Sequence, residues 1–310
     1  MKQKYAIKKP FYKQVFPMIV FVGLIIYTIS FLTPLAWSII TSFKSNFDYN
    51  MNLFGLPKEF AIYNGEEHVF GNYLVAWDNI YVKKAMDVGG YLLNVEIHMW
   101  ELLGNSLLYA VVATIITTFS HAIAAYLAAR YSQFRLMRWL YPIVIFTMLL
   151  PIVGNLASSI KVMRDIGFYD NLIGLWIAKG SFLGSHFLIF YAAFKGISWE
   201  YAEAAFIDGA SHAKVLFEIM LPLAMGTMSA IFVLNFIGFW NDWNINVVYL
   251  PSFPMLAYAL YTYQETVVGD AAKPPAQTAG CMLVAFPMFV MFIIFRKKLM
   301  GNLTIGGIKG

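Results

Sequence analysis

The sequence predicts an all-α polytopic membrane protein with six transmembrane helices and both termini in the cytoplasm. Of its 310 residues, 60% are hydrophobic and only 13% are charged, and the mean hydropathy is +0.64. Soluble domains carry about 25% charged residues, so this apolar excess cannot all be hidden in a core. Uncharged runs of about 20 residues, the length that crosses a bilayer, recur along the chain. Basic residues also gather on alternate connecting segments.

Six apolar runs are long enough to be spans. The first follows five lysines, but it is longer than the 7–15-residue apolar core of a signal peptide, so we expect it to be retained as a helix. The fourth contains Lys179 and the fifth contains Asp242. The expected spans cover residues 15–43, 103–129, 139–160, 172–194, 223–247 and 278–295.

The distribution of Lys and Arg predicts the orientation. Four segments carry 14 of the 22 basic residues and only four of the 17 acidic residues, so they are expected in the cytoplasm: 1–14, 130–138, 195–222 and 296–310. The predicted organisation is a cytoplasmic segment at 1–14, a first helix at 15–43, an extracytoplasmic cap of short helices at 44–101, a five-helix transmembrane domain at 102–298 containing a loop at 195–222, and a cytoplasmic tail at 299–310.

Several classes of function are excluded. No basic stripe suggests nucleic-acid binding, and the single cysteine, Cys281, cannot form a disulfide within the chain. The five histidines lie far apart without metal-ligand spacing, and no arrangement of nucleophile, base and acid is evident. The phosphate-binding pattern GxxxxGK[ST] is absent. We therefore expect no catalytic residues, and no metal or cofactor bound by this chain.

One polar stretch interrupts the apolar second half, "EAAFIDGASHAKVLFEIMLP" at residues 203–222. Ser198 is a predicted N-cap, and Gly209 is suited to the left-handed conformation that ends a helix. Ser211 is expected to cap a second short helix, in which Lys214 pairs with Glu218 at i,i+4. The pattern predicts a helix held rigidly at both ends. It is either a docking element with a smooth alanine face or an amphipathic hairpin that rests on the membrane.

The stretch resembles the EAA signature of ABC-importer permeases. The matching pattern is Glu-Ala-Ala, three residues, Gly, nine residues, Ile-x-Leu-Pro. "EAAFIDGAS", the Trp-Asn-Asp triplet at 240–242 and the ending "MGNLTIGGIKG" resemble the carbohydrate-uptake, maltose-type branch. The resemblance implies a type I importer fold and a coupling helix that inserts into an ATPase subunit. The residues implied in that contact are Glu203, Ala204, Ala205, Asp208, Gly209, Ile219, Leu221 and Pro222.

The resemblance also implies a set of partners and a location. These are a second homologous permease of a different sequence, two cytoplasmic ATPase subunits that carry ATP and Mg²⁺, an extracytoplasmic solute-binding protein, and the lipid of a bacterial cytoplasmic membrane. The implied cargo is a sugar or oligosaccharide. Other readings are an ABC permease for glycerol phosphate or an acidic oligosaccharide, a secondary transporter, and a membrane-anchored interaction protein.

Polar residues near the fifth span are candidates for the transport path, because polar groups within membranes are costly. Asn235 is expected midway along this span with aromatic neighbours, and Asp242 near its outer end, where it either caps the helix or contacts a ligand or binding protein. The candidate path residues are Asn235, Phe239, Trp240, Asn241 and Asp242. Lys179 either extends to the interface or marks a break at Gly180. For His121, hydrogen bonding between helices is favoured over a place in the path.

Overall fold

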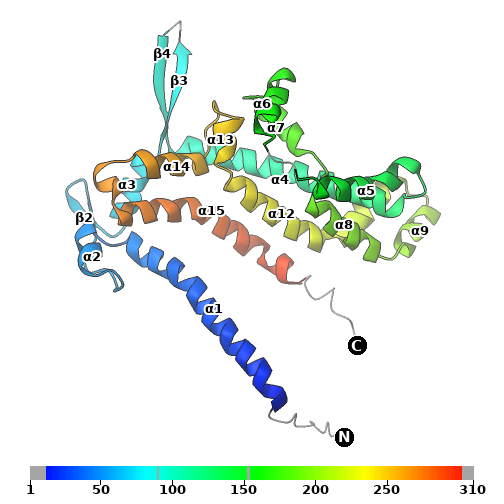
Figure 1. Ribbon diagram of the computed structural model, residues 1–310, viewed down its shortest axis with the longest axis horizontal. Coiled ribbons are helices and arrows are strands. Elements are labelled where there is room, and N and C mark those ends of the chain that lie inside the picture. Colours follow the sequence, from blue (N-terminus) through cyan, green and yellow to red (C-terminus); the bar gives the residue numbers. More distant parts are fainter. Residues whose placement is uncertain (1–11, 89–90, 152–153, 302–310) are drawn as a thin grey trace. The chain divides into compact units, whose positions relative to one another are not determined.

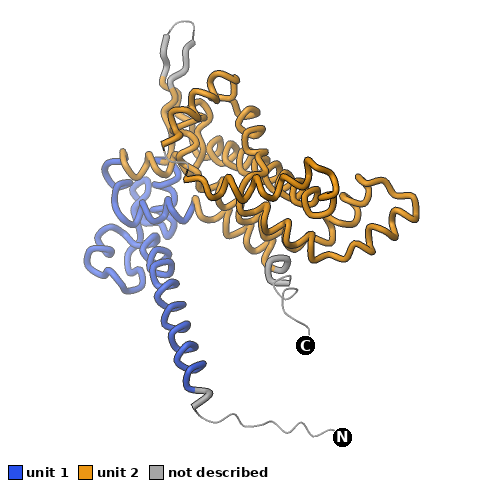
Figure 2. Tube along the Cα trace, turned by 45° about the vertical axis from the view of Figure 1, so that its right-hand side comes forward, with its two compact units in different colours: residues 1–79, 267–283 blue, residues 80–266, 284–310 orange. Residues whose placement is uncertain are grey.

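The structure is a computed structural model that describes residues 12–88, 91–151 and 154–301 (Figure 1). It is predominantly helical, but two β-hairpins depart from the predicted all-α class, and it divides into two compact units (Figure 2). Unit 1 comprises the residues up to Asn79 together with Val267–Leu283, and unit 2 comprises Ile80–Thr266 and the residues from Val284 onward. Most of the predicted terminal segments, 1–11 and 302–310, lies outside the described residues.

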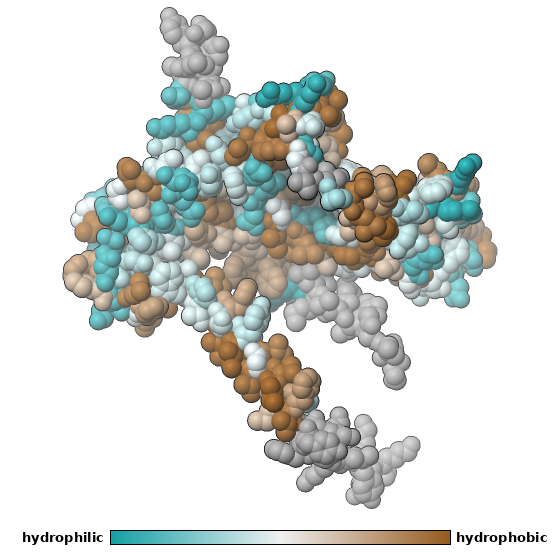
Figure 3. All heavy atoms as spheres, in the orientation of Figure 1, coloured by the Kyte–Doolittle hydropathy of each residue, from teal (hydrophilic) through white to brown (hydrophobic). Residues whose placement is uncertain are grey.

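Helix α1, Tyr12–Ser42, begins unit 1 and contains the first predicted span. Its Val15–Ser42 portion is apolar and long enough to cross a membrane, and within this chain none of its most apolar stretch is buried. Figure 3 shows apolar side chains along the helix. A helix that is apolar on all sides is stable only when lipid or another protein covers it.

The polar segment 44–79 follows α1. We expected short helices here, and two are present, but the segment also contains a β-hairpin, so the expectation was incomplete. Asn64 and Gly65 form its turn with φ of 52° and 86°, the two positive values that a type I′ turn requires. The elements are α2 (Asn46–Met51), β1 (Ala61–Tyr63), β2 (Glu66–His68) and α3 (Gly71–Asn79), and α3 packs on the 3₁₀-helix η2 (Gly269–Ala272).

Buried polar groups hold segment 44–79 against the end of α1. The Asn72 Nδ2 donates to the carbonyls of Ser42 and Lys44 at 3.0 and 2.7 Å. The fully buried Lys44 ammonium donates in turn to the carbonyls of Asn52 and Leu53. Backbone groups at an irregular chain reversal therefore find partners inside the protein, as buried polar groups must.

Asp48 of α2 is also buried, and its carboxylate accepts the N–H of Lys58 at 2.8 Å. Burial by itself raises the pKa of Asp48. Hydrogen bonds from the backbone of Lys58 and Glu59 and from the Asn52 side chain, together with the positive charge of Lys44, outweigh this effect, so the pKa lies below its ordinary value of 3.8. The ionised carboxylate therefore contributes to the stability of this segment.

Unit 2 begins with a second hairpin that the prediction of a helical cap missed. Strands β3 (Val82–Val88) and β4 (Tyr91–Ile97) pair antiparallel in a register from Val82↔Ile97 to Val88↔Tyr91. Its two strands are joined in the sequence by two glycines, a recognised signal for a hairpin.

Helix α4, Met99–Arg130, is the centre of unit 2 and contains the second predicted span. It packs against α5, α7, α8, α12 and α14. Small side chains let neighbouring helix backbones approach closely. The small residues buried along α4 include Ala110, Ala113, Ala122 and Ala125.

The third and fourth predicted spans are not continuous helices, which corrects the prediction. The region of 139–160 contains the end of α5, Arg135–Leu149, and the start of α6, Leu156–Asp165. The region 172–194 is divided into α7 (Leu172–Lys179) and α8 (Ser185–Gly196). Of the two alternatives given for Lys179, the helix break at Gly180 is present.

The fifth predicted span, 223–247, is also interrupted. A helical rod over His212–Leu223 meets α12 (Met225–Trp240) at 77°, and α13 (Asn244–Val248) is separate. Helix α14 (Leu256–Thr266) follows. The last helix, α15 (Pro274–Gly301), contains the sixth predicted span. Within the described residues, three helices are long and apolar enough to cross a membrane, or four if the bent pair is one span.

Candidate functional site

The motif residues of loop 195–222 lie on two short helices joined by a tight turn. The first, α9, runs over Glu200–Ile207, close to the predicted bounds. Trp199 occupies its N-cap position, one residue after the predicted Ser198. The Ser198 Oγ still accepts the N–H of Glu200 at 3.3 Å, so the serine contributes at the start of the helix as expected.

Gly209 ends α9 with φ of +82°, which confirms the predicted left-handed conformation. A Cβ at this position would meet no other atom within 4 Å. The requirement for glycine is therefore one of backbone conformation and not of space. The Asp208 N–H donates to the carbonyls of Ala204 and Phe206, and these bonds close the last turn.

Helix α9 has an open face and a packed face. Glu203, Ala204, Asp208 and Gly209 are exposed, and Ala205 is half-buried. On the opposite face Ala202 is fully buried. The open face presents two carboxylates around a small alanine surface. It can therefore receive a partner that approaches closely and carries basic groups.

The second part of the loop anchors the first. Ser211 caps the short helix α10 (His212–Lys214) through the N–H of Lys214, and the Lys214 ammonium lies 3.9 Å from the Glu218 carboxylate, both as predicted. The chain then continues through a π-helical turn, η1 (Val215–Met220), and α11 (Leu221–Leu223). Wide π turns inside helices are frequent at functional positions.

The final motif residues differ from the first in their surroundings. Leu221 is only 4% exposed, Ile219 is half-buried, and Pro222 is exposed. Leu221 belongs to the apolar core that α4, α8 and α12 share. The motif thus combines exposed residues on α9 with apolar residues that fix the loop to the rest of unit 2.

Sequence reasoning missed an aromatic cluster beneath α9, formed by Tyr131, Trp199, Phe206 and His212. The Tyr131 hydroxyl and His212 Nδ1 lie 2.7 Å apart, and the rings of Phe206 and His212 meet at 4.8 Å between centroids. Tyr131 also makes edge contacts with Trp199. The available signal was the concentration of aromatic residues on both sides of the motif, but no spacing rule links residues so far apart in the chain.

The candidate path residues lie on α12 and just beyond it. The Asn235 side chain is buried, and its Nδ2 donates to Thr118 Oγ1 of α4 at 3.0 Å. The Phe239 ring packs edge-on against Tyr109 at 5.9 Å. The Trp240 Nε1 donates to the carbonyl of Val284 at 3.0 Å.

The next two residues are more open. Asn241 is exposed and Asp242 is half-buried, and both lie after the end of α12. The Lys179 ammonium lies 5.2 Å from the centre of the Phe239 ring. Phe239 of α12 and Lys179, the last residue of α7, therefore lie in one region of unit 2.

His121 differs from its predicted role. Its Nδ1 lies 2.7 Å from the carbonyl of Thr117, one turn back on α4, so this hydrogen bond is within the helix and not between helices. The contact between helices is instead made by its ring, which meets the ring of His186 on α8 at 5.8 Å.

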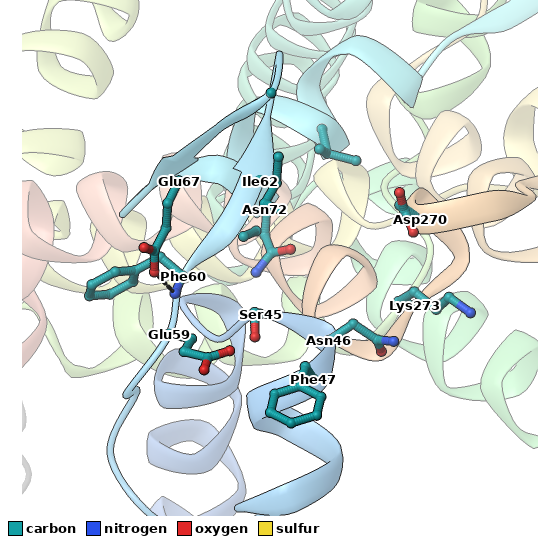
Figure 4. A pocket seen from close by; sticks show the side chains of 13 residues that line it. Ser45, Asn46, Phe47, Glu59, Phe60, Ile62, Glu67, Asn72, Asp270 and Lys273 are labelled. Atoms are coloured by element: carbon teal, nitrogen blue, oxygen red, sulfur yellow. Dashed lines mark hydrogen bonds between the residues drawn. The ribbon is translucent and has the colours of Figure 1, made fainter.

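Unit 1 contains a cavity of about 530 Å³ on segment 44–79 and η2. Carboxylates of Glu59, Glu67 and Asp270 line it together with aromatic and amide side chains (Figure 4). The Glu67 Oε1 accepts the N–H of Phe60 at 2.6 Å, so this carboxylate supports the local backbone. Within the described residues no group of three or more His, Cys, Asp or Glu side chains is placed to hold a metal ion.

Residues 121–296 match the sequence profile of a family described as the binding-protein-dependent transport system inner membrane component. This range includes every candidate residue of loop 195–222 and of the path.

Among curated relatives, the chain is 25% identical to the diacetylchitobiose uptake system permease protein of Streptomyces coelicolor, over 91% of this chain and 86% of the relative. It is 23% identical to a probable starch degradation products transport system permease protein of Thermoanaerobacterium thermosulfurigenes, over 94% and 96%. It is 26% identical to the trehalose transport system permease protein of Mycobacterium tuberculosis, over 66% and 76%.

The fold is also similar to a solved structure. A chain of a bacterial ABC transporter involved in the import of the acidic polysaccharide alginate matches with a TM-score of 0.72 and 20% identity, over 94% of this chain and 99% of that chain. At this identity the similarity shows the fold.

Proposed function

The chain belongs to the family of binding-protein-dependent transport system inner membrane components, and we propose that it forms half of the translocation path of an ATP-driven sugar or oligosaccharide importer. The relatives named for diacetylchitobiose, trehalose and starch degradation products support a carbohydrate cargo. The observation that carries the coupling to ATP is the open face of α9, built from the motif residues and ended by a left-handed glycine.

In this proposal α9 is the coupling helix. Glu203 and Asp208 meet basic groups of a cytoplasmic ATPase subunit, and Ala204, Ala205 and Gly209 allow its backbone to approach closely. Ile219, Leu221 and Pro222 hold the connection to α12. The ATP and Mg²⁺ bind to the ATPase subunits, since this sequence has no phosphate-binding loop. Closure of two ATPases on ATP moves the coupling helices and opens the path to the opposite side.

The proposed assembly lies in a bacterial cytoplasmic membrane, with two ATPases inside and a solute-binding protein outside. The second half of the path comes from a homologous permease of a different sequence. We propose six crossings with both termini in the cytoplasm, some of them made by broken helices. Broken helices are tolerated at membrane depth where they line a cavity or are buried in protein. The organisation proposed from the sequence is retained, with 44–101 outside and 102–298 as the permease domain.

For the path itself, the proposal assigns the end of α12. Phe239 offers an aromatic surface, and Asn241 and Asp242 offer polar groups. Asn235 and Trp240 are buried, so in this proposal they support the path from the core. Amides and carboxylates match sugar hydroxyls, while aromatic rings cover the apolar faces of a sugar ring.

Co-purification in a mild detergent tests the assembly. We expect the chain to purify with an ATPase and a second permease, and the reconstituted complex to take up sugar only with ATP and the binding protein. Radiolabelled diacetylchitobiose, trehalose and maltooligosaccharides are the first probes, with glycerol 3-phosphate and alginate oligosaccharide as the charged alternatives. Uptake by the chain alone, driven by an ion gradient and abolished by an ionophore, would identify a secondary transporter and overturn the proposal.

A further inference from the structure

Arg130, the last residue of α4, lies where α8 ends and the loop to α9 begins. Its Nη2 donates to the carbonyls of Phe194 and Ile197. The centre of its guanidinium lies 5.3 Å from the ring centre of Trp199. One side chain of α4 thus contacts the last turn of α8, the connecting segment and the N-cap residue of α9.

These contacts have a physical cause. The last four carbonyls of a helix lack partners within the helix and carry partial negative charge. Phe194 lies in the last turn of α8, and Ile197 is its C-cap. Arginine is suited to this position because its planar, permanently charged group can donate to two acceptors while its face stacks on an aromatic ring.

The connection between α8 and α9 is only three residues long, Ile197 to Trp199. Arg130 contacts the first and the last of these three residues. The aromatic cluster continues the support, because Tyr131, the residue after Arg130, contacts Trp199 and His212. The base of α9 is therefore fixed to the end of α4 as well as to α8.

We propose that Arg130 is a positioning residue that transmits displacement of α9 to α4. This inference rests on the proposed function, in which an ATPase moves α9. Since the guanidinium holds the connecting segment at both ends, displacement of α9 pulls on α4 directly. Helix α4 contains 32 residues and is about 48 Å long, so a rigid α4 carries the displacement to its other end. Without Arg130, only the aromatic contacts of Tyr131 remain between α4 and this region, so less of the displacement of α9 reaches α4.

The experiment places a reporter at the far end of α4. Glu101 is exposed in the first turn of this helix, and Glu101→Cys is introduced into a Cys281→Ser background. The full complex, with its ATPases, partner permease and binding protein, is reconstituted in lipid nanodiscs. The rate of reaction with a membrane-impermeant maleimide is measured without nucleotide and after trapping with ATP and vanadate. The change is normalised to the amount of trapped nucleotide.

We expect trapping to change the rate at the reporter in the reference complex. Arg130→Gln removes the charge and the planar guanidinium donors. It should reduce that change at least ~5-fold per trapped nucleotide, the low end of typical coupling between sites. Arg130→Lys keeps a charge but lacks the planar guanidinium, and its change at the reporter should fall between those of the reference complex and Arg130→Gln. Arg138→Gln is the matched control, because the Arg138 Nε donates to the carbonyl of Ser132, in the segment between α4 and α5, at 3.1 Å.

A full change at the reporter in Arg130→Gln would overturn the inference. If that variant does not assemble, the same measurement is made on Arg130→Lys and Trp199→Leu. A change at the reporter as large as in the reference complex in both variants also overturns the inference. Failure of the proposed function looks different. In that case the reference complex itself contains no ATPase or traps no nucleotide, whatever residue occupies position 130. Normal trapping without any change at the reporter in the reference complex would instead overturn the inference.

Discussion

Loop 195–222 and segment 44–79 are both polar interruptions in an apolar chain, but different contacts hold them in place. The loop is fixed mainly by aromatic and apolar side chains, among them Tyr131 and Leu221, with Arg130 at its start, and it exposes its polar residues on α9. Segment 44–79 is fixed by buried polar groups such as Lys44 and Asn72, which satisfy backbone carbonyls. The difference indicates that the loop is built to present a surface, whereas the segment is built to hold its own irregular backbone.

The largest expected effect is at the turn of the loop. Gly209→Val forces a β-branched residue to adopt φ of +82°, where side chains with a Cβ are strained. The turn then shifts the open face of α9, and we expect ATP-driven uptake to fall about 100-fold, near the upper end of typical coupling. Uptake by proteoliposomes and the amount of permease in the membrane are the measurements.

Gly196→Val provides the matched control. A Cβ at this position also meets nothing within 4 Å, but the backbone there lacks a positive φ. Uptake near the wild-type rate is expected. Equal losses in both variants would show that bulk near the loop matters more than the conformation at Gly209.

A smaller loss is expected when the charge of the open face is reversed. Glu203→Lys should weaken binding of the ATPase and lower uptake about 10-fold, within the usual range of coupling between sites. Glu200→Lys is its control, because both acids are exposed in the first turn of α9 and both interact with the helix dipole. Co-purification of the ATPase with each variant distinguishes them, and identical behaviour would remove the special role of Glu203.

For segment 44–79 the comparison predicts a loss of local stability without a loss of ATP hydrolysis. Asn72→Leu leaves the carbonyls of Ser42 and Lys44 without their donor and should destabilise this segment by about 2 kcal/mol. Hydrogen exchange over 44–79 measures the loss, while ATP hydrolysis per assembled complex should stay unchanged. Asn50→Leu, at an exposed site, is the control and should have little effect. Impaired hydrolysis in Asn72→Leu would contradict the separation of the two regions.

The smallest expected effect is a loss of local stability at low pH. Because the pKa of Asp48 is lower in the folded protein than in the unfolded chain, its stabilisation is fully present above the ordinary value of 3.8 and is lost as the pH falls through the lower, folded value. Hydrogen exchange of 46–60, corrected for intrinsic rates, should show protection that falls on acidification below pH 3.8. Asp48→Asn should flatten this dependence, and an unchanged pH profile would contradict the assigned role.

The local features of the loop were predictable, since they depend on neighbouring residues. Gly209, Ser211 and the Lys214–Glu218 pair all appear as the sequence predicts. The long helices α1, α4 and α15 were predictable from composition for the same reason. The functional roles of the motif and path residues stay predictions.

The breaks in the remaining helices could not be predicted from apolar composition, because a continuous helix and two broken ones use the same residues. The interruption after Lys179, one of two alternatives given for this residue, places its carbonyl 2.9 Å from Thr117 Oγ1 of α4, a contact across more than 60 residues of sequence. The contact of Arg130 with α8 spans more than 60 residues of sequence and follows no local pattern. Both hairpins, in contrast, carry a recognised signal in the residues that join their strands, Asn64-Gly65 and Gly89-Gly90.

The hydrogen bonds of Asn72 have an evolutionary consequence. They hold Asn72 against the carbonyls of Ser42 and Lys44 at the end of α1, so the residues between form a loop whose two ends are fixed together. Such a loop can gain or lose residues at its exposed turn, Asn64–Gly65, without displacing the segments before and after it. Changes of length that arise at this turn during evolution are therefore expected to alter this surface and to leave the end of α1 in place.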